Sequence, residues 1–436
     1  IKASLWLTPF FAILLYAVVT RITHRIGNWL LITGSIDEKT ALLGLTMVGA
    51  RSLLETVITA NLSFLVFTFG SLLVAIQVAG GQYTPRIIAT TLLRDNAIRL
   101  TVGYFVFTLL FNLRVLNKMG DVVVHQFNTF IAGVLGIISL VVFLYLIDYA
   151  ARFLRPISIA QRVGEFGIKV IENIYPEMTK GPQTTQLSFS STSPPRTITH
   201  VGTSGIVLAV NIAGLVAQAQ KAGGIIEFVP QVGDFLAVDD PMFRLHRCSD
   251  DIDDHHLRSL VALGSERTLE QDATFAFRIL VDIAIKALSP AINDPTTAVL
   301  AIDQLHRLLR FVGLRHVSDK EHHDGAGELR LIFRTPNWED FVHLTCTEIR
   351  HFGTGSIQIV RRLRSMLENL IQTLPPHRHA ELLQQIDLLD RMIEGHYAFP
   401  EDLALARIAD SQGLGGTVGM RPARSMLTAV VVSEES

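Results

Sequence analysis

The sequence of 436 residues is poor in cysteine and in charge. Its two cysteines, Cys248 and Cys346, lie far apart without metal-site spacing, so we expect free thiols in a reducing compartment. Only 18% of the residues are charged and the formal net charge is −2, which provides no basic surface for DNA or RNA. We therefore expect no nucleic-acid partner.

Motifs of the common enzyme classes are also absent. The chain has no Walker phosphate loop, no nucleophile elbow, no H-E-x-x-H and no dinucleotide fingerprint. Acids and histidines crowd together only at 250–256, with a weaker echo at 322–324, but adjacent side chains on one strand or helix diverge instead of converging on an ion. A loop before a helix N-terminus explains these acids better. We expect no metal and no cofactor, and an enzyme is the least favoured class.

Apolar residues are abundant, at 49% of the chain with a mean hydropathy of +0.37. Four mostly apolar stretches, at about 3–20, 58–79, 100–115 and 130–147, are each close to the length that crosses ~30 Å of hydrocarbon. Residues 1–150 contain ten Lys or Arg and six Asp or Glu, whereas the rest of the chain contains 28 Lys or Arg and 34 Asp or Glu. The sequence predicts a transmembrane domain of four helices over 1–150.

The remainder of the chain has the character of a soluble α+β region. Residues 151–196 read as a helix emerging from the membrane and a Ser/Thr/Pro-rich connector. Alternating apolar residues from Ile206 predict a small β-rich module at 197–247. Its Gly233-Asp234 turn is typical of biotinyl- and lipoyl-type barrels, but no attachment lysine follows. A mainly helical domain is predicted for 248–410, with one strand at 328–333, and a flexible tail for 411–436.

The second span carries polar or small residues on more than one side. At 100° per residue, Asn61 and Thr68 share one side of the helix, whereas Ser63, Gly70 and Gln77 fall on roughly the opposite side. One interpretation is close packing between helices, because small and polar residues allow it. The other is that one face lines a hydrated pore in an oligomer. The candidate pore or packing residues are Asn61, Ser63, Thr68, Gly70, Ser71 and Gln77.

A polar, Gly-rich segment from Gly80 to Arg86 follows this span. Glycine backbone and an adjacent arginine suit an anion or a lipid headgroup, with Gln82, Thr84 and Arg86 as the contacts. The simpler interpretation, which we favour, is a turn with Arg86 extended to the membrane interface.

A second candidate segment lies in the helical domain. Asp282 and Lys286 stand four apart and predict an ion pair on one helix, which Ser289-Pro290 ends. The run 293–296 then predicts the capped start of the next helix. Alternatively, polar side chains of this segment bind a small ligand or a neighbouring subunit. The candidate residues are Asp282, Lys286, Ser289, Asn293, Asp294 and Thr297.

Two motifs carry a resemblance to a known family. The first is LVAIQVAGGQYTPR at 73–86, followed by Leu93-Arg94-Asp95. The second is KALSPAINDPTTA at 286–298, preceded by Glu270-Gln271-Asp272, Arg278 and the run 281–284. In this order they resemble the bacterial membrane proteins called domain of unknown function 2254. The resemblance spans nearly the whole chain and implies an architecture but no activity.

Two functional hypotheses remain open at this point. One is a homo-oligomeric, channel-like protein of the bacterial inner membrane, with an ion or small ligand as cargo and a cytoplasmic vestibule or gate. The other is a membrane-anchored scaffold or sensor whose soluble part binds a partner or small ligand. In both, the lipid bilayer is a partner. Eight basic residues flank the spans on one side and six on the other, which favours a cytoplasmic 151–436.

Overall fold

The computed structural model describes residues 7–32, 46–82, 95–119, 126–153, 155–179, 181, 194–249, 252–269, 271–317 and 320–416. The candidate residues Thr84 and Arg86 and residues 417–436 of the expected tail lie outside these ranges. The chain divides into two compact units, Ile1–Ser158 and Ile159–Ser436. Each is described by itself.

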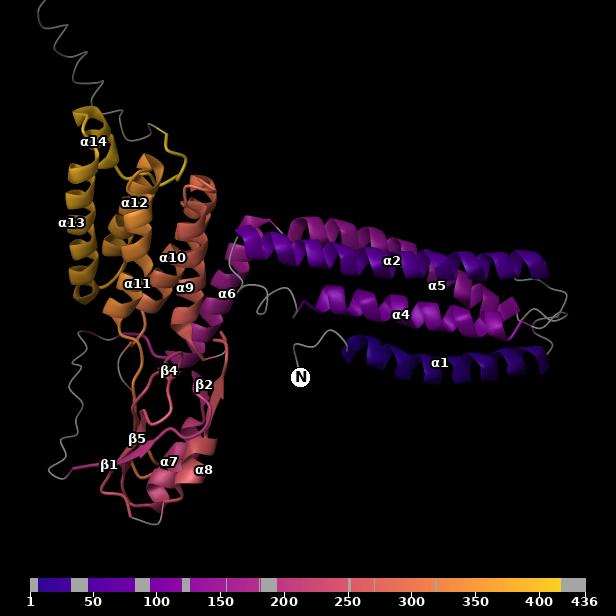
Figure 1. Ribbon diagram of the computed structural model, residues 1–436, viewed down its shortest axis with the longest axis horizontal. Helices are drawn as coiled ribbons and strands as arrows, with labels where there is room; N and C mark the ends of the chain where they lie inside the picture. Colours follow the sequence, from indigo (N-terminus) through magenta and orange to yellow (C-terminus); the bar gives the residue numbers. More distant parts are fainter. Residues whose placement is uncertain are drawn as a thin grey trace, which may run out of the picture. The chain divides into compact units, whose positions relative to one another are not determined.

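The first unit is built around four helices that run side by side (Figure 1). The third of them packs against the other three, and Leu54, Phe111, Val115 and Ala132 form a buried cluster between them. A Cβ atom built at Gly136 would lie 2.6 Å from a methyl carbon of Val57, so glycine permits a close helix approach there. The helices are α1 (Leu7–Ile32), α2 (Met47–Gln82), α4 (Asn96–Asn117) and α5 (Gln126–Phe153).

Three helical segments of the described chain have the length and apolar character to cross a membrane: Met47–Val74, Asn96–Asn117 and Phe127–Arg152. The apolar part of α1, Thr8–Thr23, is shorter. At ~1.5 Å per residue it covers about 24 Å, against a hydrocarbon thickness of ~30 Å. Three membrane helices are therefore supported, and the fourth expected span is not confirmed.

Helix α2 is longer at both ends than the predicted span of 58–79. It begins at Met47 and continues without a break through Gly80 and Gly81 to Gln82. We expected a turn at Gly80–Arg86, but its first three residues, Gly80 to Gln82, are helical. Glycine costs only about 1 kcal/mol in a helix interior, which the neighbouring turns of a long helix offset.

The second unit contains two sheets. One has five strands in the order β1-β5-β3-β8-β7, with β3 and β8 parallel and the other neighbours antiparallel; the second has the order β4-β2-β6 and is antiparallel. The strands are β1 (Arg196–Thr199), β2 (Gly205–Val210), β3 (Ile225–Phe228), β4 (Phe235–Leu236), β5 (Pro241–His246), β6 (Val261–Gly264), β7 (Lys320–His323) and β8 (Leu329–Phe333).

Strands from outside 197–247 complete these sheets. β8, the strand predicted at 328–333, pairs in parallel with β3, with Ile226 opposite Leu331, and β6 pairs with β2. Phe228 stacks on Phe333 with ring centroids 5.7 Å apart. One core therefore joins the β-rich region to parts of the chain about 100 residues further on.

Helices form the rest of the second unit, where α9 to α13 stand as a group in Figure 1. α9 packs against α10 and α11, and α12 against α10 and α13. Gly167 of α6 faces Ala276 and Leu308, so α6 lies close to α9 and α10. The helices are α6 (Pro156–Ile174), α7 (Ile212–Lys221), α8 (Asp254–Ser259), α9 (Ala273–Ala287), α10 (Pro295–Gly313), α11 (Trp338–Gly353), α12 (Ile357–Thr373), the short 3-10 turn η2 (Pro376–Arg378), α13 (His379–His396) and α14 (Pro400–Ala406).

Candidate functional site

The inward side of α2 carries two of the predicted polar residues. Asn61 and Thr68 are 0% and 2% exposed. Each is bonded to its own helix: Asn61 Nδ2 donates to the Val57 carbonyl at 2.9 Å, and Thr68 Oγ1 donates to the Phe64 carbonyl at 2.6 Å. These two residues therefore belong to the interior of the bundle.

The outward side of α2 carries the others. Ser63, Gly70 and Gln77 are exposed, and nothing lies within 4 Å of a Cβ built at Gly70, whereas Ser71 is half-buried between the two sides. The same exposed side continues toward the start of the helix at spacings of three and four residues. We call these exposed positions the outer stripe: Ser52, Thr56, Thr59, Ser63, Val66, Gly70, Leu73 and Gln77.

Further buried polar groups, which the sequence analysis did not single out, lie in α4. Thr108 and Asn112 are both 0% exposed, and Asn112 Nδ2 donates to the Thr108 carbonyl at 2.8 Å. Within the described chain, Thr108 Oγ1 and the Oδ1 atoms of Asn61 and Asn112 are buried without a hydrogen-bond partner. A spacing of four residues along α4 would have shown that Thr108 and Asn112 share a face.

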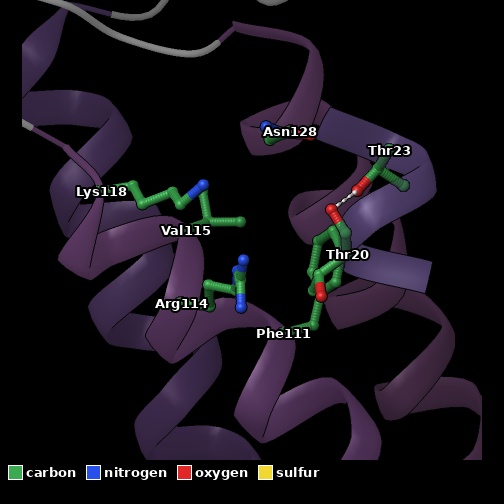
Figure 2. A pocket seen from close by; sticks show the side chains of 7 residues that line it. All are labelled: Thr20, Thr23, Phe111, Arg114, Val115, Lys118 and Asn128. Atoms are coloured by element: carbon green, nitrogen blue, oxygen red, sulfur yellow. Dashed lines mark hydrogen bonds between the residues drawn. The ribbon is translucent and has the colours of Figure 1, made fainter. Parts of the chain in front are cut away.

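A cavity of about 20 Å³ lies where α4 ends and α5 begins (Figure 2). Two basic residues of α4, Arg114 and Lys118, reach it from one side, and α1 and α5 contribute polar groups from the other. The sequence alone identifies these two residues only as basic charges that flank the spans. The lining consists of Thr20, Thr23, Phe111, Arg114, Val115, Lys118 and Asn128.

The three candidate contacts after the second span are Gln82, Thr84 and Arg86. Gln82 is the last residue of α2, and the structure does not describe its side chain. Thr84 and Arg86 lie outside the described residues. An anion or lipid contact by this group stays a prediction.

The downstream segment has the predicted cap. Asp294 precedes α10 and accepts hydrogen bonds from the Thr297 backbone N–H at 3.1 Å and from Thr297 Oγ1 at 2.5 Å, with Pro295 in the first turn. Ser289 Oγ donates to the Lys286 carbonyl at 2.7 Å. Asn293 has φ of +49°, which its short polar side chain tolerates. Described contacts of these side chains thus stabilise the connection between α9 and α10.

Asp282 pairs with Arg278, which lies one turn before it on α9, and the predicted pair of Asp282 with Lys286 stays a prediction. Arg278 Nε donates to Asp282 Oδ1 at 2.7 Å, and the two Nη atoms donate to both carboxylate oxygens of Glu348 on α11 at 2.7 and 2.9 Å. The hydrogen bonds from Arg278 lower the pKa of Glu348. Sequence reasoning missed Glu348, which is 70 residues away.

The Gln271-Asp272 pair just before α9 also has structural contacts. Gln271 Oε1 accepts from the Val210 backbone N–H at 3.0 Å, which fastens this segment to β2. Asp272 caps α9 by accepting from the Phe275 N–H at 3.0 Å, and it is 3% exposed. Burial raises the pKa of this carboxyl. Together, these contacts connect the start of α9 to the three-stranded sheet.

The described part of the acidic cluster at 250–256 also has structural contacts. Asp253 caps α8 by accepting from the His255 N–H at 2.9 Å, and Asp254 pairs with Arg196 at 2.8 Å. No group of three or more His, Cys, Asp or Glu residues among the described ones is placed to hold a metal ion.

Comparison with known proteins agrees with this architecture. Uncharacterized proteins of Mycobacterium bovis and of two strains of Mycobacterium tuberculosis are 25% identical to the chain over 427 residues, which cover 93% of it and 79% of each relative. No solved structure matches. Residues 2–369 match the family described as "Predicted membrane protein (DUF2254)". Since this match covers most of the sequence, the chain belongs to the DUF2254 family of predicted membrane proteins.

Proposed function

We propose that this chain is a homo-oligomeric protein of the bacterial inner membrane in which the outer stripe of α2, repeated in each copy, lines a water-filled pathway for an ion or small solute. The proposal includes four membrane helices per chain, with α1 as the first. The observation that carries it is the exposure of polar and small residues along the outer stripe, while the opposite side of the same helix is buried.

Exposure to lipid is a poor alternative for this stripe. The hydroxyls of Thr56, Thr59 and Ser63 donate to carbonyls four residues earlier, at 2.7 to 2.9 Å, so lipid would tolerate them singly. The Gln77 amide requires more, because an amide without partners in hydrocarbon costs several kcal/mol. Other copies of the chain, or water between them, meet this requirement in a closed ring.

The alternation of apolar and polar positions favours a pathway over a sealed interface. Val66 and Leu73 are 71% and 65% exposed on the same stripe. In a ring, such apolar side chains form constrictions that close by excluding water, while the polar positions between them remain hydrated. The outer stripe contains no charged residue, so it carries no charge that selects the sign of an ion. Glu55, the described carboxylate of α2, lies off the stripe and pairs with Arg51 at 3.0 Å.

The test measures assembly and flux with the same variants. Gln77→Leu and Gly70→Leu should reduce ion flux in proteoliposomes at least severalfold, while Leu144→Ala, at an exposed position of α5, should leave flux unchanged. Native mass spectrometry and light scattering report whether the particles keep their size. A monomeric wild-type protein, or stripe variants with wild-type flux and assembly, would show that α2 faces lipid.

A second candidate function is a membrane-anchored scaffold or sensor. It is favoured by apolar side chains exposed on the second unit: Phe352, Leu383 and Phe399 are 55%, 54% and 68% exposed. A wild-type oligomer that conducts nothing, with a lipid-filled axis in electron cryo-microscopy maps, would select this function over the pathway.

The proposed topology places residues 151–436 in the cytoplasm. A labelling site in this part of the chain must be exposed. Gln384 on α13 is exposed and suits this purpose, whereas Gly353 at the end of α11 is buried against Ile359. Gln384→Cys should resist a membrane-impermeant maleimide in intact cells and react after permeabilisation. Ready reaction in intact cells would reverse the topology.

A further inference from the structure

Two like charges share the cavity at the end of α4. Arg114 and Lys118 stand four residues apart on one helix face and both line it (Figure 2). Like charges at this spacing destabilise a helix by a few tenths of a kcal/mol. Arg114 is half-buried as well, so its charge is partly desolvated. An anionic group at this cavity would offset both costs.

The described residues of the first unit do not supply one. Their three carboxylates are engaged elsewhere: Glu55 pairs with Arg51, Asp148 pairs with Arg152, and Asp95 caps α4 and accepts from Tyr149. Asp95 precedes Arg114 by 19 residues, which is about 28 Å of helix. Within the described chain, Arg114 and Lys118 have no anionic partner.

Among the other polar groups of the cavity, Asn128 is the one that can donate to an anion, because the two threonine hydroxyls donate to their own helix. Thr20 Oγ1 donates to the Tyr16 carbonyl at 2.8 Å and Thr23 Oγ1 to the Thr20 carbonyl at 3.3 Å, so α1 satisfies its own hydroxyls. Asn128 Oδ1 is buried without a partner among the described residues. Rotation of the terminal amide exchanges its oxygen and nitrogen, so this side chain can turn its NH₂ group to the cavity.

The size of the cavity limits what enters it. A water molecule needs about 10–15 Å³ of such space, so about 20 Å³ holds one or two oxygen atoms. An occupant must therefore insert one or two oxygens and keep the rest of its mass at the mouth. A phosphate ester does this, and the guanidinium fork matches two of its oxygens.

We propose that this cavity binds a phosphate oxyanion, with Arg114 as the bidentate donor and Lys118 as the second positive charge. A lipid headgroup and free inorganic phosphate share this chemistry. The cavity lies at the end of a candidate membrane helix, Asn96–Asn117, where headgroup phosphates of a bilayer are found.

The experiment uses the full chain in detergent at constant ionic strength. Inorganic phosphate is titrated in one arm, and phosphatidylglycerol is compared with the phosphate-free lipid monoolein in the other, with thermal unfolding and native mass spectrometry as readouts. Stabilisation by inorganic phosphate identifies a free anion, and stabilisation by phosphatidylglycerol alone identifies a lipid. Both results support the site. No effect of either probe would overturn it.

Variants test whether the effect comes from this cavity. Arg114→Gln and Lys118→Gln should each weaken the binding about tenfold or more, because each removes a charge-assisted hydrogen bond. Arg114→Lys should restore part of it. Arg51→Gln removes an exposed arginine of α2 and should change nothing. Lys118 is exposed, so Lys118→Gln remains informative if Arg114→Gln fails to fold. An equal loss in Arg51→Gln would show unspecific charge attraction and overturn the proposal.

Discussion

Removing the Arg278 guanidinium should cost more free energy of unfolding than an ordinary ion pair. The side chain makes three short hydrogen bonds: one to Asp282 on its own helix, and two to Glu348 that join α9 to α11. Arg278→Gln keeps a side chain of moderate length and polarity but removes the charge. It leaves both carboxylates without their shared donor.

The exposure of the three partners sets the size of the effect. The side chains of Arg278 and Asp282 are 25% and 15% exposed, and that of Glu348 is 40% exposed, so water screens the Glu348 pair. Hydrogen bonds to charged groups contribute ~1.5–3 kcal/mol each before this screening. We expect Arg278→Gln to cost about 2–3 kcal/mol and Glu348→Gln about 1 kcal/mol, with a coupling of about 1 kcal/mol in the double-mutant cycle.

The assay is unfolding of the detergent-solubilised protein followed by the fluorescence of tryptophan, since Trp338 is buried at the start of α11. The control is Arg391→Gln. The side chains of Arg391 and its partner Asp387 are both 64% exposed, so this substitution should change the free energy of unfolding by only a few tenths of a kcal/mol. Because Arg278 lowers the pKa of Glu348, the wild-type advantage is present above the ordinary carboxyl range and is lost as pH falls through the lowered value.

Equal, small effects in Arg278→Gln and Arg391→Gln would refute this reasoning. So would a pH-independent difference between wild type and Arg278→Gln. Normal stability combined with lost flux would transfer the segment from Asp282 to Asp294 to the functional site.

Three further outcomes follow from single contacts. Because burial raises the pKa of Asp272, wild-type protein should lose stability as pH rises from ~3.8 through the raised pKa. Asp272→Asn keeps the cap of α9 and should remove this loss. An unchanged pH profile measured by thermal unfolding would contradict this. Burial raises the pKa of Cys346 to about 12, so a thiol reagent at pH 8 should modify it only after unfolding, and rapid modification of native protein would contradict that. Gly136→Ala should cost about 1 kcal/mol through contact with Val57, whereas Gly395→Ala, with nothing within 4 Å, should cost nothing.

Local patterns of the sequence predicted local structure well. The Asp294-Pro295 cap lies at the start of α10, and the strand predicted at 328–333 corresponds to β8. Each depends on residues within a few positions, so periodicity and cap chemistry suffice to find it.

Contacts between distant residues were beyond the same reasoning. Glu348 lies 70 residues from Arg278, and β8 lies about 100 residues from its parallel neighbour β3. Nothing in a short window identifies such partners. The helical Gly80-Gly81 pair was missed for another reason: glycine signals a turn, but a long helix can carry two of them at its end.

The length of α2 has a consequence for the space around the protein. Its 36 residues span about 54 Å, and fitting that length inside ~30 Å of hydrocarbon would require a slope of nearly 60° from the bilayer normal. Membrane helices rarely exceed 40°. Part of α2 must therefore extend into water at one or both membrane surfaces, where it can contact molecules that never enter the lipid.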